Sequence, residues 1–464
     1  GSEMCIRDSS IVEIGKYAFE NCSNLKEVKF SDKLEIIGER AFYNCDKIQK
    51  IELPKSLKEM RNGYNGGVFS NCSGLKKINI PKSLKEGNLA FEGCSLLNEI
   101  EWEDGITKIP DGLFKNCAGL ENVKIPDTVT EIGRYAFENC DNLEDVVLSE
   151  KMGILDEGAF YDCDKIQEIE LPNSLKEMKN GYANGVFSDC SSLKKISIPK
   201  SLKEGNLAFK GCSLLNEIEW ENGITKIPDG LFKNCVGLEN IKIPDTVTEI
   251  GRYAFENCSD LVNISFPNSL QVIGEGAFKD CKKIKDINLP NGLQEMQNGY
   301  YNGAFSYCTG LQKVSIPSSL KKGYFAFKGC NSLSEIEWIQ GITKIPEGLF
   351  RECAGLKSVV IPDSITEIES NAFAECSNLQ EIYLPNNTVD IADNAFNKCP
   401  YLVMKMNRDT YASRHAIVNK IPFEWIGNSM GNMTDGFLNR SGCEYQTVTQ
   451  GALSLIHISE PTRH

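Results

Sequence analysis

Histidine and tryptophan are scarce in this chain, which has three histidines and four tryptophans among 464 residues. It contains no H-E-x-x-H pair, no glycine-rich phosphate loop, no calcium-loop pattern and no nucleophile turn of the G-x-S-x-G kind. No apolar run approaches the roughly 18 residues of a membrane helix. We therefore expect no enzyme activity, cofactor, metal site or membrane span in this sequence.

A basic surface is also lacking. The chain has 50 lysines and arginines against 64 aspartates and glutamates, a formal net charge of -14. Proteins that bind nucleic acid usually carry a basic patch, so we expect no nucleic-acid partner. The apolar content of 41% and the charged content of 25% are ordinary for a folded protein.

The two ends of the chain do not resemble natural protein. Residues 1–9 read "GSEMCIRDS", and residues 453–464 read "LSLIHISEPTRH". Back-translated, the two ends are complementary strands of one oligonucleotide, as in a sequencing-library adapter. We exclude both segments from the predicted fold, as one would an expression scar. His415 is then the one remaining histidine, and Cys5 leaves the set of cysteines.

Cysteines recur at regular intervals after a phenylalanine. Each of seventeen closes an aromatic-x-x-Cys phrase: Cys22, Cys45, Cys72, Cys94, Cys117, Cys140, Cys163, Cys190, Cys212, Cys235, Cys258, Cys281, Cys308, Cys330, Cys353, Cys376 and Cys399. The gaps between them are 23, 27, 22, 23 and 23, a series that occurs three times and sums to 118. A period of 20–29 residues is typical of a leucine-rich-repeat solenoid.

The unit 120–140 shows how the repeated apolar residues would pack into a core. Leu120, Val123 and Ile125 are predicted to point inward from a short strand, and Pro126 ends that strand. Further apolar steps are Val129, Ile132, Ala136 and Phe137, the last two in a helical or 3₁₀ piece, and Gly133 permits a turn. A single unit cannot bury its apolar face, whereas stacked units build one continuous core.

The cysteine ladder is predicted to be structural, with buried, reduced and inert thiols. The alternatives are disulfides between repeats and zinc sites. An odd number of cysteines does not suit pairing, and neither C-x-x-C nor a nearby histidine is present for zinc.

The repeated phrase resembles the BspA-like leucine-rich-repeat surface proteins over residues 10 to about 427. The resemblance implies an α/β-type repeat solenoid of about 17 repeats, with a parallel sheet on one face and short helical or 3₁₀ turns. We expect one right-handed solenoid at 10–427, in three 118-residue blocks, with strands starting near Leu25, Ile48, Leu75, Leu97 and Leu120 and their copies.

A helix-strand cap is predicted at 400–427. Asp409 would cap the helix, whose inner face would carry Tyr411, Ala412, His415, Ala416 and Val418; "IPFEWIG" would be the last strand. Residues 428–452 read as a linker or the start of another domain, and Cys443 has no assigned role.

Two repeated surface features could bind a partner. The first is the outward strand position, with the candidates Lys29, Glu101, Lys124, Glu219, Lys242 and Glu337. The second is the loop of the 27-residue unit, with Tyr64, Tyr182, Tyr300 and Tyr301. A solvated sheet face and a tyrosine that covers the solenoid edge are the structural alternatives. Trp102, Trp220 and Trp338, which end strands at matched inward positions, are predicted to be core.

Repetition also bears on function. Residues 73–140 and 191–258 differ at six of 68 positions, so no catalytic constellation would be unique, whereas repeated patches suit multivalent contacts. The resemblance implies an extracellular or cell-surface adhesion module for host matrix proteins or other cells. Two alternatives stay open: a targeting or spacer arm of a larger surface enzyme, and a cytosolic signalling scaffold.

Overall fold

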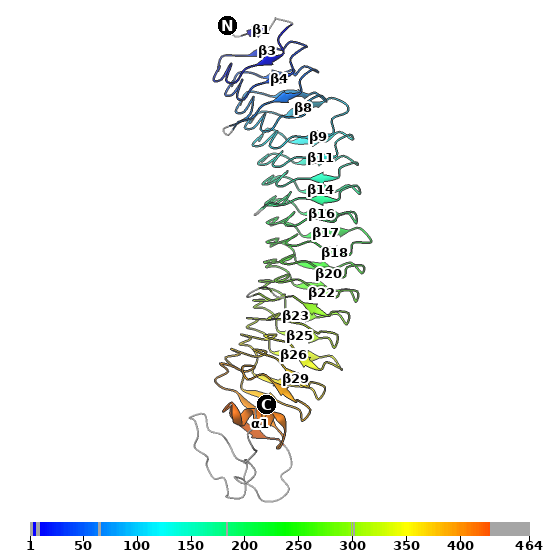
Figure 1. The fold of residues 1–464 in the computed structure, drawn as a ribbon, viewed down its shortest axis with the longest axis vertical. Helices are drawn as coiled ribbons and strands as arrows, with labels where there is room; N and C mark the ends of the chain where they lie inside the picture. Colours follow the sequence, from blue (N-terminus) through cyan, green and yellow to red (C-terminus); the bar gives the residue numbers. More distant parts are fainter. Residues whose placement is uncertain are drawn as a thin grey trace, which may run out of the picture. The chain divides into compact units, whose positions relative to one another are not determined.

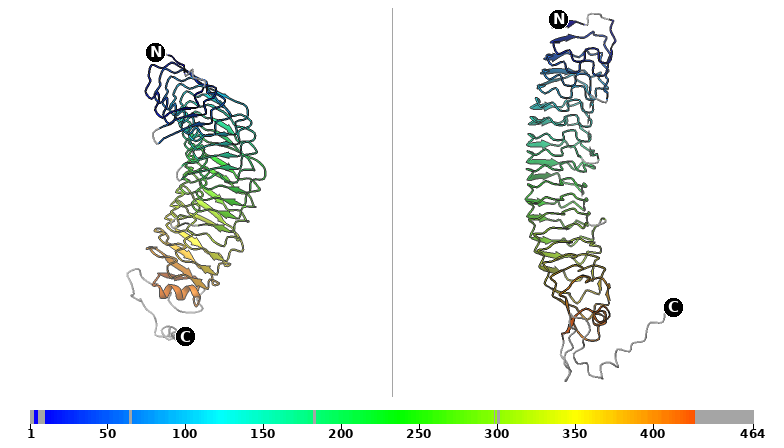
Figure 2. Two further views of the ribbon diagram at one scale, coloured as in Figure 1. Left: turned by 45° about the horizontal axis from the view of Figure 1, so that its top comes forward. Right: turned by 90° about the vertical axis from the view of Figure 1, so that its left-hand side faces the viewer.

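The computed structural model describes residues 3–5, 10–63, 66–181, 184–297, 299 and 302–426. The chain forms two compact units, 1–282 and 283–464. Each unit is a parallel β-solenoid, in which every turn contributes a strand to a first ladder and most turns contribute a shorter strand to a second ladder (Figures 1 and 2). The predicted repeat solenoid with a parallel sheet is confirmed.

The first ladder of unit 1 alternates outward polar with inward apolar side chains. Its strands are β3 (Glu27–Lys29), β5 (Lys50–Ile51), β7 (Lys77–Ile80), β8 (Glu99–Trp102), β10 (Asn122–Lys124), β12 (Asp145–Val147), β14 (Glu168–Glu170), β16 (Lys195–Ile198), β17 (Glu217–Trp220), β19 (Asn240–Lys242) and β21 (Asn263–Ser265). In β10, Val123 is buried between the exposed Asn122 and Lys124. The strands begin two residues after the leucines predicted to start them, because those leucines are buried in the preceding turn.

The second ladder of unit 1 consists of two-residue strands with one outward and one inward side chain. They are β2 (Glu13–Ile14), β4 (Ile36–Ile37), β6 (Glu59–Met60), β9 (Lys108–Ile109), β11 (Glu131–Ile132), β13 (Ile154–Leu155), β15 (Glu177–Met178), β18 (Lys226–Ile227), β20 (Glu249–Ile250) and β22 (Val272–Ile273). Residues 3–5 form a further strand, β1 (Glu3–Cys5), parallel to β3. The open edge of a ladder can pair with any short extended segment.

Unit 2 repeats both ladders. Its first ladder has β23 (Asp286–Asn288), β25 (Lys313–Ile316), β26 (Glu335–Trp338), β28 (Ser358–Val360), β30 (Glu381–Tyr383), β32 (Val403–Met406) and β33 (Phe423–Trp425). Its second ladder has β24 (Glu295–Met296), β27 (Lys344–Ile345), β29 (Glu367–Ile368) and β31 (Asp390–Ile391). All pairings between these strands are parallel where the structure describes them.

The core of each turn is as the sequence predicts. In the unit 120–140, all eight apolar residues assigned to the interior, from Leu120 to Cys140, are buried. Phe137 stacks between Phe114 and Phe160, with ring centroids 5.5 and 5.2 Å away. Gly133 is required by a close approach, since a Cβ atom there would lie 2.8 Å from the backbone nitrogen of Asp111.

The expected helical pieces are separate hydrogen-bonded turns. Backbone bonds span three residues, as from the nitrogen of Cys140 to the oxygen of Phe137, 3.3 Å. Tyr135 and Asn139 have φ of 55° and interrupt any helix, because a right-handed helix needs negative φ. Asparagine and aspartate adopt positive φ at lower cost than most residues, which explains their frequency before the ladder cysteine.

The cap comprises α1 (Tyr411–Val418) followed by β33, so the predicted helix and strand are both present. Thr410 caps the helix by accepting a hydrogen bond from the nitrogen of Ser413, 3.2 Å. Asp409, the predicted cap, lies one residue too early and has φ of 61°. The predicted inner face is also partly wrong, because Tyr411 and Val418 are 41% and 74% exposed.

His415 is buried in the cap, with its Nδ1 atom 3.3 Å from Nδ2 of Asn419. Its Nε2 atom has no hydrogen-bond partner among the described residues. Burial lowers the pKa of His415, an effect that the charge of Asp393 opposes. His415 therefore binds a proton more readily in the unfolded chain than in the folded protein. The neutral side chain favours the folded state, and this stabilisation is lost as the pH falls below about 6.5.

We expect the melting temperature to fall between about pH 7 and pH 5.5, the range in which an ordinary histidine gains its proton. Circular dichroism melts of the wild type and of His415→Gln would measure this. The variant should lose most of the pH dependence in that range. An unchanged slope in the variant would show that His415 does not carry the effect.

Candidate functional site

The first ladder presents the predicted outward residues at its surface. Glu101, Glu219 and Glu337 are exposed and occupy the same place in the three blocks. Their in-register neighbours are Asn79, Ser197 and Ser315. Lys29, Lys124 and Lys242 are exposed as well. The six candidates therefore lie on the strand face, in separate turns rather than in one cluster.

A Glu–Lys–Glu cluster forms around each of the three glutamates. The Nζ atom of Lys77 contacts Glu99 and lies 2.6 Å from Glu101. Lys195 lies 3.3 Å from Glu217 and 2.9 Å from Glu219, and Lys313 lies 2.6 Å from Glu335 and 3.4 Å from Glu337. Each cluster carries one net negative charge. Hydrogen bonds to Glu101 and Glu99 hold the pKa of Lys77 above its usual range.

The remaining lysine candidates differ in how they are paired. Lys29 lies 3.1 Å from Glu27. Lys124 and Lys242 have no carboxylate within ion-pair distance among the residues that the structure describes. Next to Lys124 in the ladder is Val147, which is 54% exposed. The outward face of the first ladder thus combines ion-paired carboxylates, lysines without an ion-pair partner among the described residues, and exposed aliphatic side chains.

The tyrosine candidates Tyr64, Tyr182, Tyr300 and Tyr301 lie outside the described residues. The bases of their loops are described. A backbone hydrogen bond closes each: Gly63 to Gly66 at 3.2 Å, Gly181 to Asn184 at 3.1 Å and Gly299 to Asn302 at 3.4 Å. The role of the tyrosines stays a prediction.

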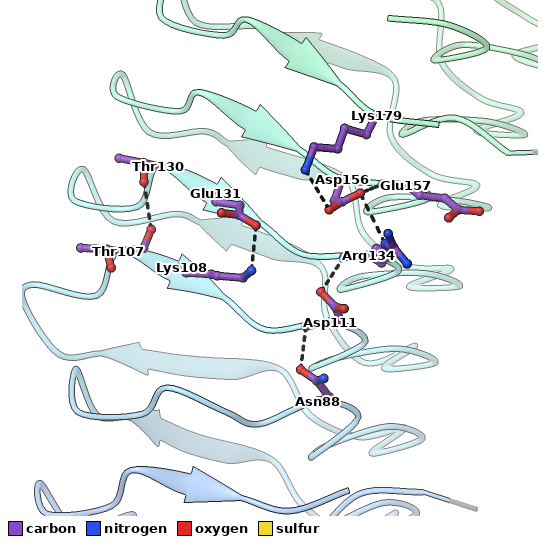
Figure 3. Close-up of polar contacts among 10 residues, drawn as sticks. All are labelled: Asn88, Thr107, Lys108, Asp111, Thr130, Glu131, Arg134, Asp156, Glu157 and Lys179. Atoms are coloured by element: carbon purple, nitrogen blue, oxygen red, sulfur yellow. Dashed lines mark hydrogen bonds and ion pairs between the residues drawn. The ribbon is translucent and has the colours of Figure 1, made fainter. Parts of the chain in front are cut away.

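The second ladder carries polar side chains that are mostly bound to one another (Figure 3). Lys108 lies 2.7 Å from Glu131, and Lys179 lies 3.4 Å from Asp156. The nitrogen of Arg134 donates to Asp111, 3.0 Å, and so joins neighbouring turns. These contacts join neighbouring turns, as the Glu–Lys–Glu clusters of the first ladder also do.

The thiol ladder lies mostly in the core. None of the seventeen ladder cysteines, all of which lie in the described residues, forms a disulfide, and fifteen are buried. The Sγ–H of Cys140 donates to the carbonyl of Phe114, 3.4 Å, and Cys117 donates to Phe91, 3.1 Å. Burial raises the pKa of Cys94 to about 12, so the thiolate is not populated at neutral pH.

Two cysteines depart from the expected burial. Cys22 is exposed and Cys399 is half-buried, because they lie in the first and last cysteine-bearing turns, where fewer described turns cover them. We expect native alkylation to label Cys22 first and to spare Cys140. After denaturation without reductant, mass spectrometry should find every ladder thiol modified. Widespread intramolecular bridges would contradict this reading.

The three predicted core tryptophans are only half-buried. Trp102 occupies the inward position taken by Ile80 in the neighbouring strand, and an indole is too large to be enclosed there. Its ring meets Phe114 edge to face with centroids 5.9 Å apart, and Trp220 and Trp338 repeat that geometry. Sequence reasoning missed this exposed aromatic surface, although the recurrence of tryptophan every 118 residues signalled a shared role.

A shallow pocket of about 260 Å³ lies beside Trp102. Its walls are Ile100, Trp102, Asn122, Val123, Lys124 and Pro126. Across the described residues, no group of three His, Cys, Asp or Glu side chains could hold a metal ion, and no helix is long and apolar enough to cross a membrane.

The chain is similar to several solved structures. A leucine-rich repeat protein from Bacteroides ovatus is 25% identical, with 82% of this chain and 92% of that chain covered and a TM-score of 0.53. One from Eubacterium ventriosum is 23% identical, with 65% and 82% covered and a TM-score of 0.43. A leucine rich cell surface protein from Faecalibacterium prausnitzii is 22% identical, with 92% and 88% covered and a TM-score of 0.32.

No curated protein sequence matches the chain. The family model described as "BspA type Leucine rich repeat region" matches residues 3–87, 86–204, 181–304 and 300–403. These segments span most of the sequence and coincide with the ladders described above. The chain therefore belongs to the BspA-type leucine-rich-repeat family.

Proposed function

We propose that the chain is a non-enzymatic protein-interaction module at a bacterial cell surface. It would adhere to host matrix proteins or to other cells through the outward face of the first ladder. The observation that carries the proposal is the recurrence of the Glu–Lys–Glu cluster in all three blocks. Membership of the BspA-type family supports the cell-surface location.

Repetition supports multivalent binding. In unit 1, the clusters around Lys77 and Lys195 are five turns apart, or about 24 Å at the usual strand spacing. Linked weak contacts can raise apparent affinity by about 10²–10⁴ without any new contact. An adhesive surface made of copies of one patch gains from each added block, whereas a catalytic site does not.

A matched pair of double variants tests which face binds. Glu101→Gln with Glu219→Gln removes two outward carboxylates from the first ladder. Glu131→Gln with Glu249→Gln removes two from the second ladder, where each also pairs with a lysine, at 2.7 and 2.8 Å. Surface plasmon resonance would measure binding of each variant of the 464-residue chain to immobilised extracellular matrix proteins and to whole bacterial cells.

The first variant should lose about tenfold or more in apparent affinity, since two sites of one avid contact are weakened together. The second should bind like the wild type. Equal loss in both variants would argue against a specific face. Failure of the wild type to bind any of these surfaces would contradict the adhesion proposal and favour the spacer-arm alternative.

A further inference from the structure

The first ladder of unit 1 is interrupted after β3 and β12, and again after each strand that ends in a tryptophan. The sheet formed by β5, β7 and β8 ends at β8, and the next sheet begins at β10. The same interruption separates β17 from β19 and β26 from β28. In each case the strand before the interruption ends in a tryptophan. The pocket beside Trp102 lies at the interruption after β8, with walls from β8 and β10.

The lining of this pocket suits one apolar side chain. Four of its six residues are apolar, and Trp102 supplies a half-buried aromatic surface. Its volume of about 260 Å³ is just below the roughly 300–1,000 Å³ of typical small-molecule sites. A sugar ring would need hydrogen-bond partners around its edge, whereas the polar lining is limited to Asn122 and Lys124. The nearby carboxylate of Glu101 is already bound to Lys77.

The positive charge of Lys124 favours a ligand with a carboxylate next to its apolar side chain. Lys124 lies on the pocket wall and has no carboxylate partner among the described residues, in contrast to Lys77 with two. A cation in this position attracts a carboxylate and repels a second cation. The occupant that fits both features is an aliphatic side chain beside a single aspartate or glutamate in an extended segment of a protein.

The other blocks provide copies with defined differences. At the matching sequence positions near Trp220, Ile241 replaces Val123 and Lys242 replaces Lys124. Beside Trp338, the lysine position is occupied by Val360, which is 64% exposed. The sites beside Trp102 and Trp220 therefore favour a carboxylate next to the bound side chain, whereas the site beside Trp338 does not.

We propose that the pocket beside Trp102 and the matching positions beside Trp220 form recognition subsites for an aliphatic side chain followed by a carboxylate in an extended protein partner. This rests on the proposed function and identifies where on the strand face the partner's side chains are received. An extended chain rises about 3.3 Å per residue, so about seven or eight residues would join the two subsites of unit 1, five turns apart.

The four tryptophans allow a direct test. The full chain is labelled with 5-fluorotryptophan, and its four fluorine resonances are assigned with single Trp→Phe variants. Acetyl-Leu-Glu-amide should shift the Trp102 and Trp220 resonances saturably and leave Trp425 unchanged. Acetyl-Leu-Lys-amide should bind these two sites more weakly, and acetyl-Gly-Glu-amide should not shift them. At Trp338 the two leucine peptides should bind alike.

The lysines provide the matched control. Lys124→Gln with Lys242→Gln should weaken acetyl-Leu-Glu-amide by about two- to fivefold, the range of an exposed ion pair, and remove the preference over acetyl-Leu-Lys-amide. The proposal is wrong if no saturable shift appears at the peptide's solubility limit, or if both leucine peptides bind Trp102 equally in the wild type. Shifts with cellobiose and not with the peptides would make the pocket a sugar subsite and would also overturn it.

A second readout separates this proposal from the proposed function. Trp102→Phe with Trp220→Phe keeps an aromatic core residue, and a circular dichroism melt checks that it folds. If this variant binds a captured protein as tightly as the wild type, the subsite proposal is wrong. The proposal that the first ladder binds a partner is unaffected by that result. If the variant binds tenfold more weakly, the subsites contribute to that binding.

Discussion

Replacing Phe137 by alanine is expected to lower the free energy of unfolding by about 3–5 kcal/mol, the usual cost of removing a buried aromatic ring. Phe137 is fully buried and stacks on a ring in the turn before it and a ring in the turn after it. In a solenoid each turn is stabilised mainly by its two neighbours, so one cavity weakens two interfaces. Urea denaturation followed by circular dichroism would measure the loss.

Val147→Ala is the surface control, because Val147 is 54% exposed on the first ladder. It should change the unfolding free energy by no more than about 0.5 kcal/mol. A loss below about 1 kcal/mol for Phe137→Ala would mean that the ring stack is not the main core of the turn.

Replacing Gly185 by alanine should also be strongly destabilising, by about 1–3 kcal/mol, through overpacking. An added Cβ atom would lie 2.2 Å from the carbonyl oxygen of Leu207 and 2.6 Å from the Cα atom of Ala208. Both are backbone atoms of the next turn, and they can move only if the hydrogen bond from Phe187 to Ala208, 2.8 Å, is strained. Thermal melts would detect the change.

Gly153→Ala is the matched control in the same unit. A Cβ atom there would meet only the carbonyl oxygen of Thr130, at 3.6 Å, which is an ordinary contact. That variant should be neutral or slightly stabilising, because alanine restricts the unfolded chain. Equal melting temperatures for the two variants would show that the turns can separate to accept a methyl group.

The sequence was sufficient to predict the repeat and its core, because each inward position recurs with the period of the cysteines. Phe137 and Cys140, for example, were assigned to the interior from one unit, and both are buried. The parallel pairing followed from stacking identical units. The strand bounds were less accurate, since the leucine before each strand is buried in a turn and shares the apolar pattern.

Other features depended on geometry that the pattern does not contain. The positive φ of Tyr135 and Asn139 replaces the expected helical pieces by turns, and apolar spacing carries no information about φ. The half-buried state of Trp102 follows from the size of the indole in an isoleucine position, which periodicity alone reads as core. Thr410, the actual helix cap, competed with an equally suitable aspartate one residue earlier.

Site-specific photocrosslinking would show which face of the chain contacts a partner. p-Benzoylphenylalanine would replace Glu101 on the first ladder or Glu131 on the second ladder, and each 464-residue protein would be irradiated with a surface-bound partner from the binding screen. We expect crosslinks from position 101 and none from position 131. Crosslinks from position 131 alone would place the partner on the second ladder and would show that the first ladder is not the binding surface.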